Sequence, residues 1–330
     1  MFKTDKSKVN DVSADAIVEL NNRIDQLIAR VAQLEAAGLG REGVQQLIQH
    51  SMLVPALDVP AFPADAPFMA FTTCAAADFQ HPRYFQLCKF MDGRPQWHRK
   101  QWEWVFILHH LFDSGALKEG ARGLGFGVGR EPLPAAFALA GATVVATDAP
   151  TDLSISSGWM SSSQHSASLE ELRFHWIPDE IFKQRISFQS ADMTNIDPQL
   201  SDFDFVWSSC CFEHLGSLRA GLDFVRNSVE TCLKPGGIAV HTTEFNLSSN
   251  DETVEESDDT VIYRRCDLEE FAEEMRERGH EVYPIIVGPQ AHGLDFHVDI
   301  PPFLPDVAHL RLRLGGYSCT SAGIVIRRGG

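Results

Sequence analysis

Segments typical of buried strands alternate with segments typical of helices over the last two thirds of the chain, and this alternation constrains the fold most. The expected strands cover residues 121–126, 143–147, 186–190, 203–208, 237–243, 281–287 and 322–327. The expected helices cover residues 99–112, 132–140, 217–233 and 267–278. Such alternation favours a mostly parallel sheet with helices on both faces. We therefore expect a doubly wound α/β fold with a seven-stranded sheet, whose last strand is an antiparallel edge strand.

The residues before this alternation differ in character. Apolar residues recur in steps of three and four from Ile17 to Leu34. This seam predicts a coiled-coil-like helix that joins copies of the chain into a homo-oligomer, or else a helix docked on its own domain. Prolines predict an extended connector at 54–68, and aromatic residues at 69–92 predict a packing layer or a cap over an active site. The expected parts are a helical extension at 1–40, a linker and cap segment at 41–95, and an α/β domain at 96–330 with an insertion at 288–318.

Charge and composition exclude several classes of partner. The formal net charge is −17, from 45 acidic and 28 basic side chains, so the surface would repel a nucleic-acid backbone or an anionic membrane. No apolar stretch is long enough to span a bilayer, and the first residues lack a signal-peptide pattern. The seven cysteines include no C-x-x-C pair, which favours reduced thiols, no zinc ribbon and a cytoplasmic location.

A glycine-rich turn is the sharpest local signal. The sequence Gly123-Leu-Gly125-Phe-Gly127-Val-Gly129 joins an expected strand to a helix that Pro132 opens. Glycines suit a turn on which a ligand lies directly against the backbone. The G-x-G-x-x-G spacing of dinucleotide-binding turns fails in every register, and no Walker A lysine follows. The turn therefore favours a ligand without a pyrophosphate.

Carboxylates follow the next two expected strands. Asp148 ends the second strand, 23 residues after Gly125, where doubly wound folds hold ribose hydroxyls. Asp192 ends the third strand and could accept a hydrogen bond from an exocyclic amine of a base on which Met193 packs. The alternative for Asp192 is an Asx-turn, in which its side chain bonds to its own backbone. These positions indicate a ligand with a ribose and an amino-bearing base at the carboxyl edge of the sheet.

Residues 115–287, with Gly323–Arg327 as a final strand, resemble the class I S-adenosylmethionine-dependent methyltransferases. The features that carry the resemblance, in chain order, are the glycine turn, Asp148, Asp192, the segment Phe203–His214 and Leu233-Lys-Pro-Gly-Gly237. The resemblance implies S-adenosyl-L-methionine as the cofactor.

The resemblance also implies residue roles. Gly125, Gly127 and Gly129 would line the methionine moiety, Asp148 would bind the ribose and Asp192 would face the adenine. Ser208, at the end of the fourth strand, joins the expected cofactor-binding residues. The family usually carries an acidic residue where this chain has Gly123, so Glu131 is the candidate for contact with the donor's amino group.

The acceptor site is expected at the ends of the fourth and fifth strands. A hydroxyl acceptor needs a base, and the candidates are His241, Glu244 and His214. Alternation places Glu244 on the opposite face from His241 if the strand persists. For His241 the alternative is a hydrogen-bonded structural histidine. For His214 it is a helix-opening residue without a catalytic role.

Two further segments are candidates for shaping that site. The insertion carries Asp295, His297 and Asp299, which could bind sugar hydroxyls or, with Glu244, a divalent cation; the alternative is a solvated excursion. In His98-Arg99-Lys100 a cation could meet the donor's carboxylate or an anionic acceptor, or the run simply starts a helix. The serine-rich 154–168 segment is a candidate lid. The sequence shows no motif with established metal-ligand spacing.

A loose likeness to methyltransferases of bacterial surface-glycan biosynthesis, in 241–246 and 295–302, makes O-methylation of a sugar or glycan hydroxyl the leading hypothesis. The alternatives are a small-molecule O- or N-methyltransferase and a non-catalytic coiled-coil subunit. A nicotinamide enzyme is disfavoured because the dinucleotide spacing fails.

Overall fold

The computed structural model describes residues 67–150, 168–301, 303 and 307–330. Contacts divide the chain into two units, Met1–Val54 and Pro55–Gly330, and every described residue belongs to the second. The expected coiled coil at 17–34 and the serine-rich residues 154–167 lie outside the described residues. Among the described helices, none has both the length and the apolar character needed to cross a membrane.

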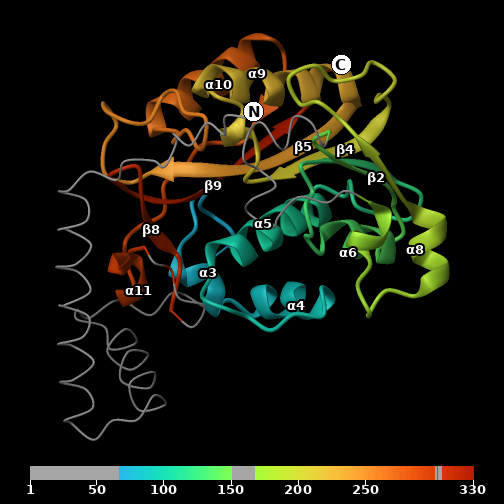
Figure 1. The fold of residues 1–330 in the computed structure, drawn as a ribbon, viewed down its shortest axis with the longest axis horizontal. Helices are drawn as coiled ribbons and strands as arrows, with labels where there is room; N and C mark the ends of the chain where they lie inside the picture. Colours follow the sequence, from blue (N-terminus) through green and yellow to red (C-terminus); the bar gives the residue numbers. More distant parts are fainter. Residues whose placement is uncertain (1–66, 151–167, 302, 304–306) are drawn as a thin grey trace, which may run out of the picture. The chain divides into compact units, whose positions relative to one another are not determined.

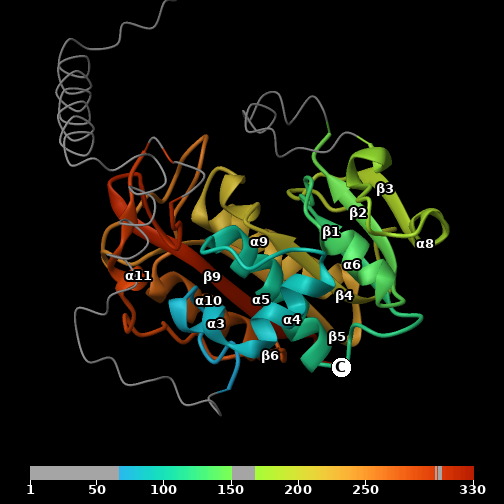
Figure 2. The same ribbon diagram turned by 90° about the horizontal axis from the view of Figure 1, so that it is seen from below.

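One mixed sheet organises the described part of the chain (Figure 2). Its strands are β1 (Arg122–Phe126), β2 (Thr143–Asp148), β3 (Ile186–Ser190), β4 (Phe203–Ser209), β5 (Leu233–Asn246), β6 (Glu281–Val282), β7 (Val298–Asp299), β8 (Arg311–Leu314) and β9 (Tyr317–Arg327). The order is β3-β2-β1-β4-β5-β9-β8-β7, and β6 also pairs with β9. Strands β1 to β5 are parallel and β9 is antiparallel to β5. The expected doubly wound α/β fold is confirmed, with nine strands rather than seven.

Helices cover both faces of this sheet (Figure 1). They are α3 (Ala76–Gln80), α4 (Pro82–Phe90), α5 (Arg99–Asp113), α6 (Leu133–Leu139), α8 (Asp179–Arg185), α9 (Leu218–Asn227), α10 (Arg265–Glu277) and α11 (Gly293–Phe296). Short turns are η2 (Leu169–Leu172), η3 (Phe212–His214) and the π-helical η4 (Ser228–Cys232). Helices α9 and α10 lie on one face, and α5 and α6 lie on the other with α4 beyond them.

A large hydrophobic core lies between the sheet and the α9–α10 layer. Phe126 from β1 packs edge-on against Phe224 from α9, and Leu268 and Phe271 from α10 join the same cluster. The central strands β4 and β5 are almost entirely buried. Strands covered on both faces favour apolar runs, and the short runs Phe205–Trp207 in β4 and Ile238–Val240 in β5 made these two recognisable from their sequence.

The chain beyond β5 departs from expectation. The 288–318 insertion contains α11, β7 and β8, and β9 begins at Tyr317 rather than at residue 322. Gly315 and Gly316, with φ of 53° and 88°, connect β8 to β9. Two successive residues with positive φ form the tight hairpin turn whose twist matches paired strands. The hairpin adds β8 outside β9, so β9 is an interior strand and not the expected edge strand.

Candidate functional site

The strand order reverses between β1 and β4, since the chain runs outward through β2 and β3 and then returns to the other side of β1 (Figure 2). In open α/β sheets the crevice at such a reversal, outside the carboxyl ends of the strands, is where ligands bind. The glycine turn follows β1 and the segment from Cys210 to His214 follows β4, so both lie at this reversal. The expected cofactor-binding residues are therefore at the position where folds of this class bind ligands.

The glycine turn curls toward β2. Gly127 and Gly129 have φ of 57° and 49°, a backbone conformation that side chains with a Cβ disfavour. Between them, the Val128 amide donates to the carbonyl oxygen of Thr147 at 3.1 Å. The Thr147 hydroxyl in turn donates to the carbonyl oxygen of Gly125 at 2.8 Å. These bonds hold the turn against the end of β2.

Asp148 ties the ends of the first three strands together. Its side chain accepts from the Gly129 amide at 3.1 Å and from the Ala149 amide at 2.8 Å. Its carbonyl oxygen accepts from the Ala191 amide, just after β3, at 2.9 Å. The residue is 1% exposed. The glycine turn and the ends of the second and third strands are thus joined through one residue, by its carboxylate and by its backbone carbonyl.

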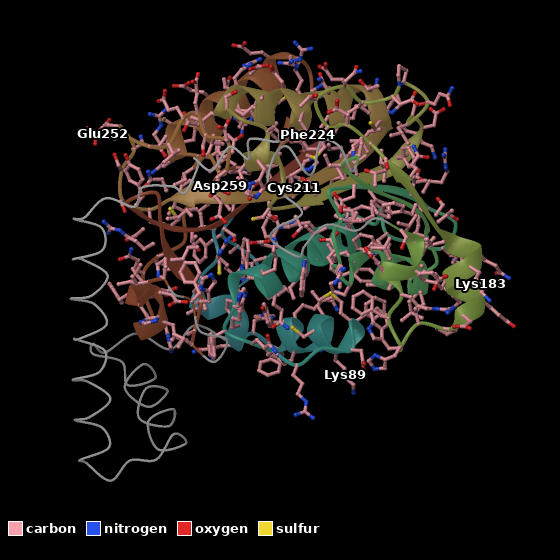
Figure 3. The ribbon with its side chains drawn as sticks, in the orientation of Figure 1. Lys89, Lys183, Cys211, Phe224, Glu252 and Asp259 are labelled. Carbon is pink, nitrogen blue, oxygen red and sulfur yellow. The ribbon has the colours of Figure 1, made fainter. Side chains whose placement is uncertain are left out.

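The residues after β3 form one wall of the turn. Asp192 accepts hydrogen bonds from both the amide and the hydroxyl of Thr194, at 2.8 and 2.6 Å. This is the geometry of the Asx-turn, the alternative to a ligand-binding role for Asp192. The Met193 sulfur lies 3.9 Å from the Cys211 sulfur. A Cβ placed on Gly127 would lie 2.9 Å from the Cys211 sulfur and 3.9 Å from that of Met193. Cys211 lies in the interior, beside the sheet (Figure 3).

Two of the expected cofactor-binding residues are engaged with other side chains. The Glu131 carboxylate accepts from the Trp207 indole at 2.6 Å, and burial raises its pKa to about 8. Ser208 is fully buried and its hydroxyl contacts the His241 ring at 2.7 Å. The geometry therefore favours a packing role for Ser208. Glu131 borders the glycine turn, with its carboxylate directed to the indole.

His241 has the geometry of a structural histidine. It is 0% exposed, and burial lowers its pKa to about 3. Its Nε2 lies 3.1 Å from the hydroxyl oxygen of Ser228, whose proton goes to the Val225 carbonyl oxygen, so Nε2 carries the proton. Its Nδ1 then accepts from Ser208. With both ring nitrogens hydrogen-bonded inside the core, His241 is not placed to take a proton from an acceptor.

Strand β5 continues without a break through Asn246, so Glu244 lies on the opposite side from His241. Glu244 pairs with Arg99 at the start of α5, and burial, more than any other cause, raises its pKa to about 7. Arg99 also pairs with Glu103 at 3.2 Å. The run His98-Arg99-Lys100 therefore starts a helix and also supplies cations to the ends of β4 and β5.

The remaining candidates have structural partners except His297, whose Nε2 is buried without a hydrogen-bond partner among the described residues. The His214 Nδ1 lies 2.5 Å from the Asp259 carbonyl oxygen and 3.1 Å from the Thr260 hydroxyl. In the insertion, Asp295 accepts from the Ala76 amide at 2.9 Å, and Asp299 lies 2.7 Å from His309. These contacts use the insertion's acids to hold the chain together.

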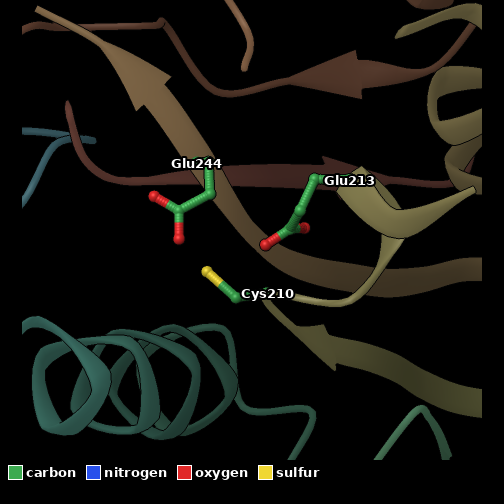
Figure 4. Close-up of side chains that lie close together, drawn as sticks. All are labelled: Cys210, Glu213 and Glu244. Atoms are coloured by element: carbon green, nitrogen blue, oxygen red, sulfur yellow. The ribbon is translucent and has the colours of Figure 1, made fainter. Parts of the chain in front are cut away.

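Sequence reasoning missed Cys210 and Glu213 as members of a site. Together with Glu244 they bring one sulfur and two carboxylate groups within 4.8 Å of one another, at the ends of β4 and β5 (Figure 4). The available signal was a thiol and a carboxylate spaced three residues apart directly after a buried strand. This spacing indicates a site only once the structure shows that the end of β5, with Glu244, lies beside Cys210 and Glu213.

Comparisons with known proteins give matches of structure only. No family model and no curated protein matches the chain. The methyltransferase domain of a bacterial Hen1 (CtHen1) has 14% identity and a TM-score of 0.45, over 70% of this chain and 100% of that one. A TehB-like SAM-dependent methyltransferase from Corynebacterium glutamicum has 15% identity and a TM-score of 0.35, over 67% and 86%. The [4+2]-cyclase SpnF has 14% identity and a TM-score of 0.42, over 68% and 81%. The fold is therefore assigned from the strand order, and the candidate site is assigned from the contacts of its own residues.

Proposed function

We propose that this chain is an S-adenosylmethionine-dependent methyltransferase. The observation that supports the proposal is that the glycine turn, Asp148 and the residues directly after β3 lie together at the carboxyl ends of β1, β2 and β3. An adenosyl group bearing a sulfonium fits this arrangement because its recognition needs close backbone approach and a ribose acceptor, without a pyrophosphate cradle.

Each donor-binding role is proposed for a residue at these strand ends. Gly125, Gly127 and Gly129 would lie against the methionine moiety, where a side chain at the second position would collide with Cys211. Asp148 would accept from the ribose hydroxyls, and Asp192, beside Met193, would face the adenine. Bound there, S-adenosylmethionine supplies an electrophilic methyl group. The protein's task is to align the acceptor atom with that group and exclude water.

We propose a hydroxyl of a sugar or glycan as the acceptor. Beside the end of β5 the surface is hollowed and lined by Phe245, Asn246, Ser248, Ser249, Asn250 and Arg265, among others. Amides, hydroxyls and a guanidinium near an aromatic ring suit a ligand rich in hydroxyl groups. Glu244 lies at the same end of the strand and replaces His241 as the group proposed to face the acceptor hydroxyl. A small-molecule hydroxyl remains the alternative acceptor.

Calorimetry with S-adenosylhomocysteine and with NADH tests the donor. We expect micromolar binding of the former and none of the latter. Asp148→Asn should weaken binding by at least about tenfold, a loss of about 1.4 kcal/mol, because an amide oxygen cannot serve two hydroxyls as a carboxylate does.

The matched control is Asp204→Asn at the amino end of β4, where the carboxylate pairs with Lys234 away from the crevice. This variant should bind the homocysteine compound like the parent. Binding of NADH alone would refute the assignment. Mass spectrometry for a one-methylene gain on candidate glycans and small hydroxyl compounds then distinguishes the acceptors.

A further inference from the structure

A buried group of side chains lies beside the crevice, where β4 and β5 end. The thiol of Cys210 and the carboxylates of Glu213 and Glu244 point toward one another (Figure 4). Their exposed fractions are 5%, 0% and 4%. We call these three residues the Cys210 cluster. Their ligand atoms lie within 4.8 Å of one another, while atoms around one tetrahedral ion are separated by ~3–4 Å, so small side-chain rotations would close the set.

Each carboxylate in the Cys210 cluster has one oxygen held by the protein and one without a partner. Glu213 accepts from the Thr243 hydroxyl at 3.2 Å through Oε2, and Glu244 pairs with Arg99 through Oε1. The other oxygens, Glu213 Oε1 and Glu244 Oε2, are buried without a hydrogen-bond partner among the residues that the structure describes. An unpaired buried carboxylate oxygen is costly. Metal-binding carboxylates commonly show this division, one oxygen oriented by the protein and one directed to the ion.

The backbone at Cys210 is also unusual. Its φ is 45°, a conformation rare for a residue with a side chain. Its amide donates to both the carbonyl oxygen and the hydroxyl of Thr242, at 3.0 and 3.1 Å, which holds this conformation in place. Strained residues persist where the surroundings enforce them, and they gather at functional sites. Here the strain accompanies a thiol placed beside two carboxylates.

Charge around the Cys210 cluster is unbalanced. Helix α5 adds Arg99, Lys100 and Glu103, with Lys100 and Glu103 paired at 3.0 Å. The Arg99 guanidinium also lies 3.8 Å from the Cys210 sulfur, and Ser209 and Ser321 donate to Glu103. With all carboxylates ionised, the cluster and these three charged neighbours hold three negative charges and two positive charges. A divalent cation bound with the Cys210 thiolate would bring this sum from one negative charge to zero.

We propose that Cys210, Glu213 and Glu244 bind a zinc ion. Zinc accepts thiolate and carboxylate ligands together, whereas magnesium and calcium prefer oxygen alone. On binding, the Cys210 thiol loses its proton to solvent and its sulfur coordinates the ion. Three protein ligands leave a fourth tetrahedral position open, the arrangement typical of zinc sites that bind a water or a substrate.

Zinc binding by the Cys210 cluster does not depend on the proposed methyltransferase function. Only one step rests on that function: the oxygen of the methyl acceptor would occupy the fourth, open position on the zinc ion. The cluster stands at the carboxyl ends of β4 and β5, and Cys210 directly precedes Cys211, which contacts the glycine turn. With zinc bound, Glu244 acts as a ligand, and the acceptor hydroxyl would be polarised by the ion instead of facing a free carboxylate.

Metal titration of the full chain tests the proposal. Metal-free protein is titrated with zinc and, separately, with cobalt(II), with stoichiometry measured by elemental analysis. We expect one equivalent of bound ion and, for cobalt, a sulfur-to-metal charge-transfer band. Cys210→Ser should remove the band, and Glu213→Gln should lower affinity by more than about 100-fold, the upper end of the effect of losing only a supporting partner.

Cys211→Ser is the matched control, because that thiol is equally buried in the adjacent position but contacts the Phe126 carbonyl and Met193. It should keep both stoichiometry and band. Circular dichroism establishes that each variant is folded. The proposal would be overturned if the folded parent protein retained no ion, or if the cobalt charge-transfer band survived Cys210→Ser. The carboxylates of Glu213 and Glu244 would then be explained as a pair that shares a proton. Binding of S-adenosylhomocysteine, measured on the same samples, keeps failure of the donor assignment distinct from failure of the metal site.

Discussion

At the scale of single residues, burial decides what a polar side chain can do. His241 and Glu244 are three positions apart on one strand, and both are nearly inaccessible. His241 is satisfied by two serine hydroxyls, whereas one oxygen of Glu244 has no partner. A neutral histidine with both ring nitrogens hydrogen-bonded contributes to stability, whereas a buried carboxylate oxygen without a hydrogen bond destabilises the folded chain.

The buried histidine should make stability depend on pH. The pKa of His241 falls from 6.5 to about 3 in the folded protein, so below pH 6.5 the unfolded chain takes up a proton that the folded chain refuses. The free energy of unfolding should therefore decrease as pH falls from 6.5 toward 3, by at most about 1.4 kcal/mol per pH unit. His241→Gln should flatten this slope in urea titrations. His175→Gln, at an exposed position, should not; equal slopes in all three proteins would contradict the account.

At the scale of elements, the turn after β1 has a backbone conformation that neither a strand nor a helix provides. It changes the direction of the chain within a few residues and joins the end of β1 to the end of β2. The geometry requires positive φ at Gly127 and Gly129, and the first of these also lies where a Cβ would meet Cys211. The sequence predicted this turn because glycine spacing reports directly on backbone conformation.

Substitution of Gly127 by alanine should separate strain from ligand binding. Gly127→Ala should cost about 1–2 kcal/mol of stability from backbone strain alone. It should also weaken S-adenosylhomocysteine binding by at least about tenfold, because the turn must shift away from Cys211. Gly236→Ala is the comparison: its φ is 78° and nothing lies within 4 Å of the added Cβ. It should lose similar stability and bind normally. Equal binding by both variants would show that the turn does not contact the donor.

At the scale of the whole described unit, one buried arginine joins segments far apart in sequence. Arg311 on β8 donates to the Cys74 carbonyl oxygen at 2.5 Å and the Thr320 hydroxyl at 2.8 Å. It also pairs with Asp295 at 3.3 Å. Asp295 in turn accepts from the Ala76 amide. The segment before α3, the insertion and the β8–β9 hairpin therefore depend on one another.

Removal of the Arg311 side chain should strongly destabilise the folded protein. Arg311→Met should lower the free energy of unfolding by about 3–5 kcal/mol, because it leaves the Asp295 carboxylate buried without its cation. Arg265→Met, which removes an exposed pair with Glu269, should barely move the urea midpoint. A small effect at Arg311, measured by the same urea transition, would mean that the insertion packs independently of this pair.

Local pattern by itself determined the strands β1 to β5, the helices α5, α6, α9 and α10, the glycine turn and the strand-end position of Asp148. These features depend on side-chain period and backbone conformation, which neighbouring residues specify. It did not indicate β7 and β8, because strands of two and four residues are too short to show a period. Only the tertiary structure decided which polar groups meet: that His241 is enclosed by Ser208 and Ser228, and that Cys210 and Glu213 face Glu244. Such encounters join positions separated by up to 34 residues, and their energy depends on burial and on partners that no local pattern contains.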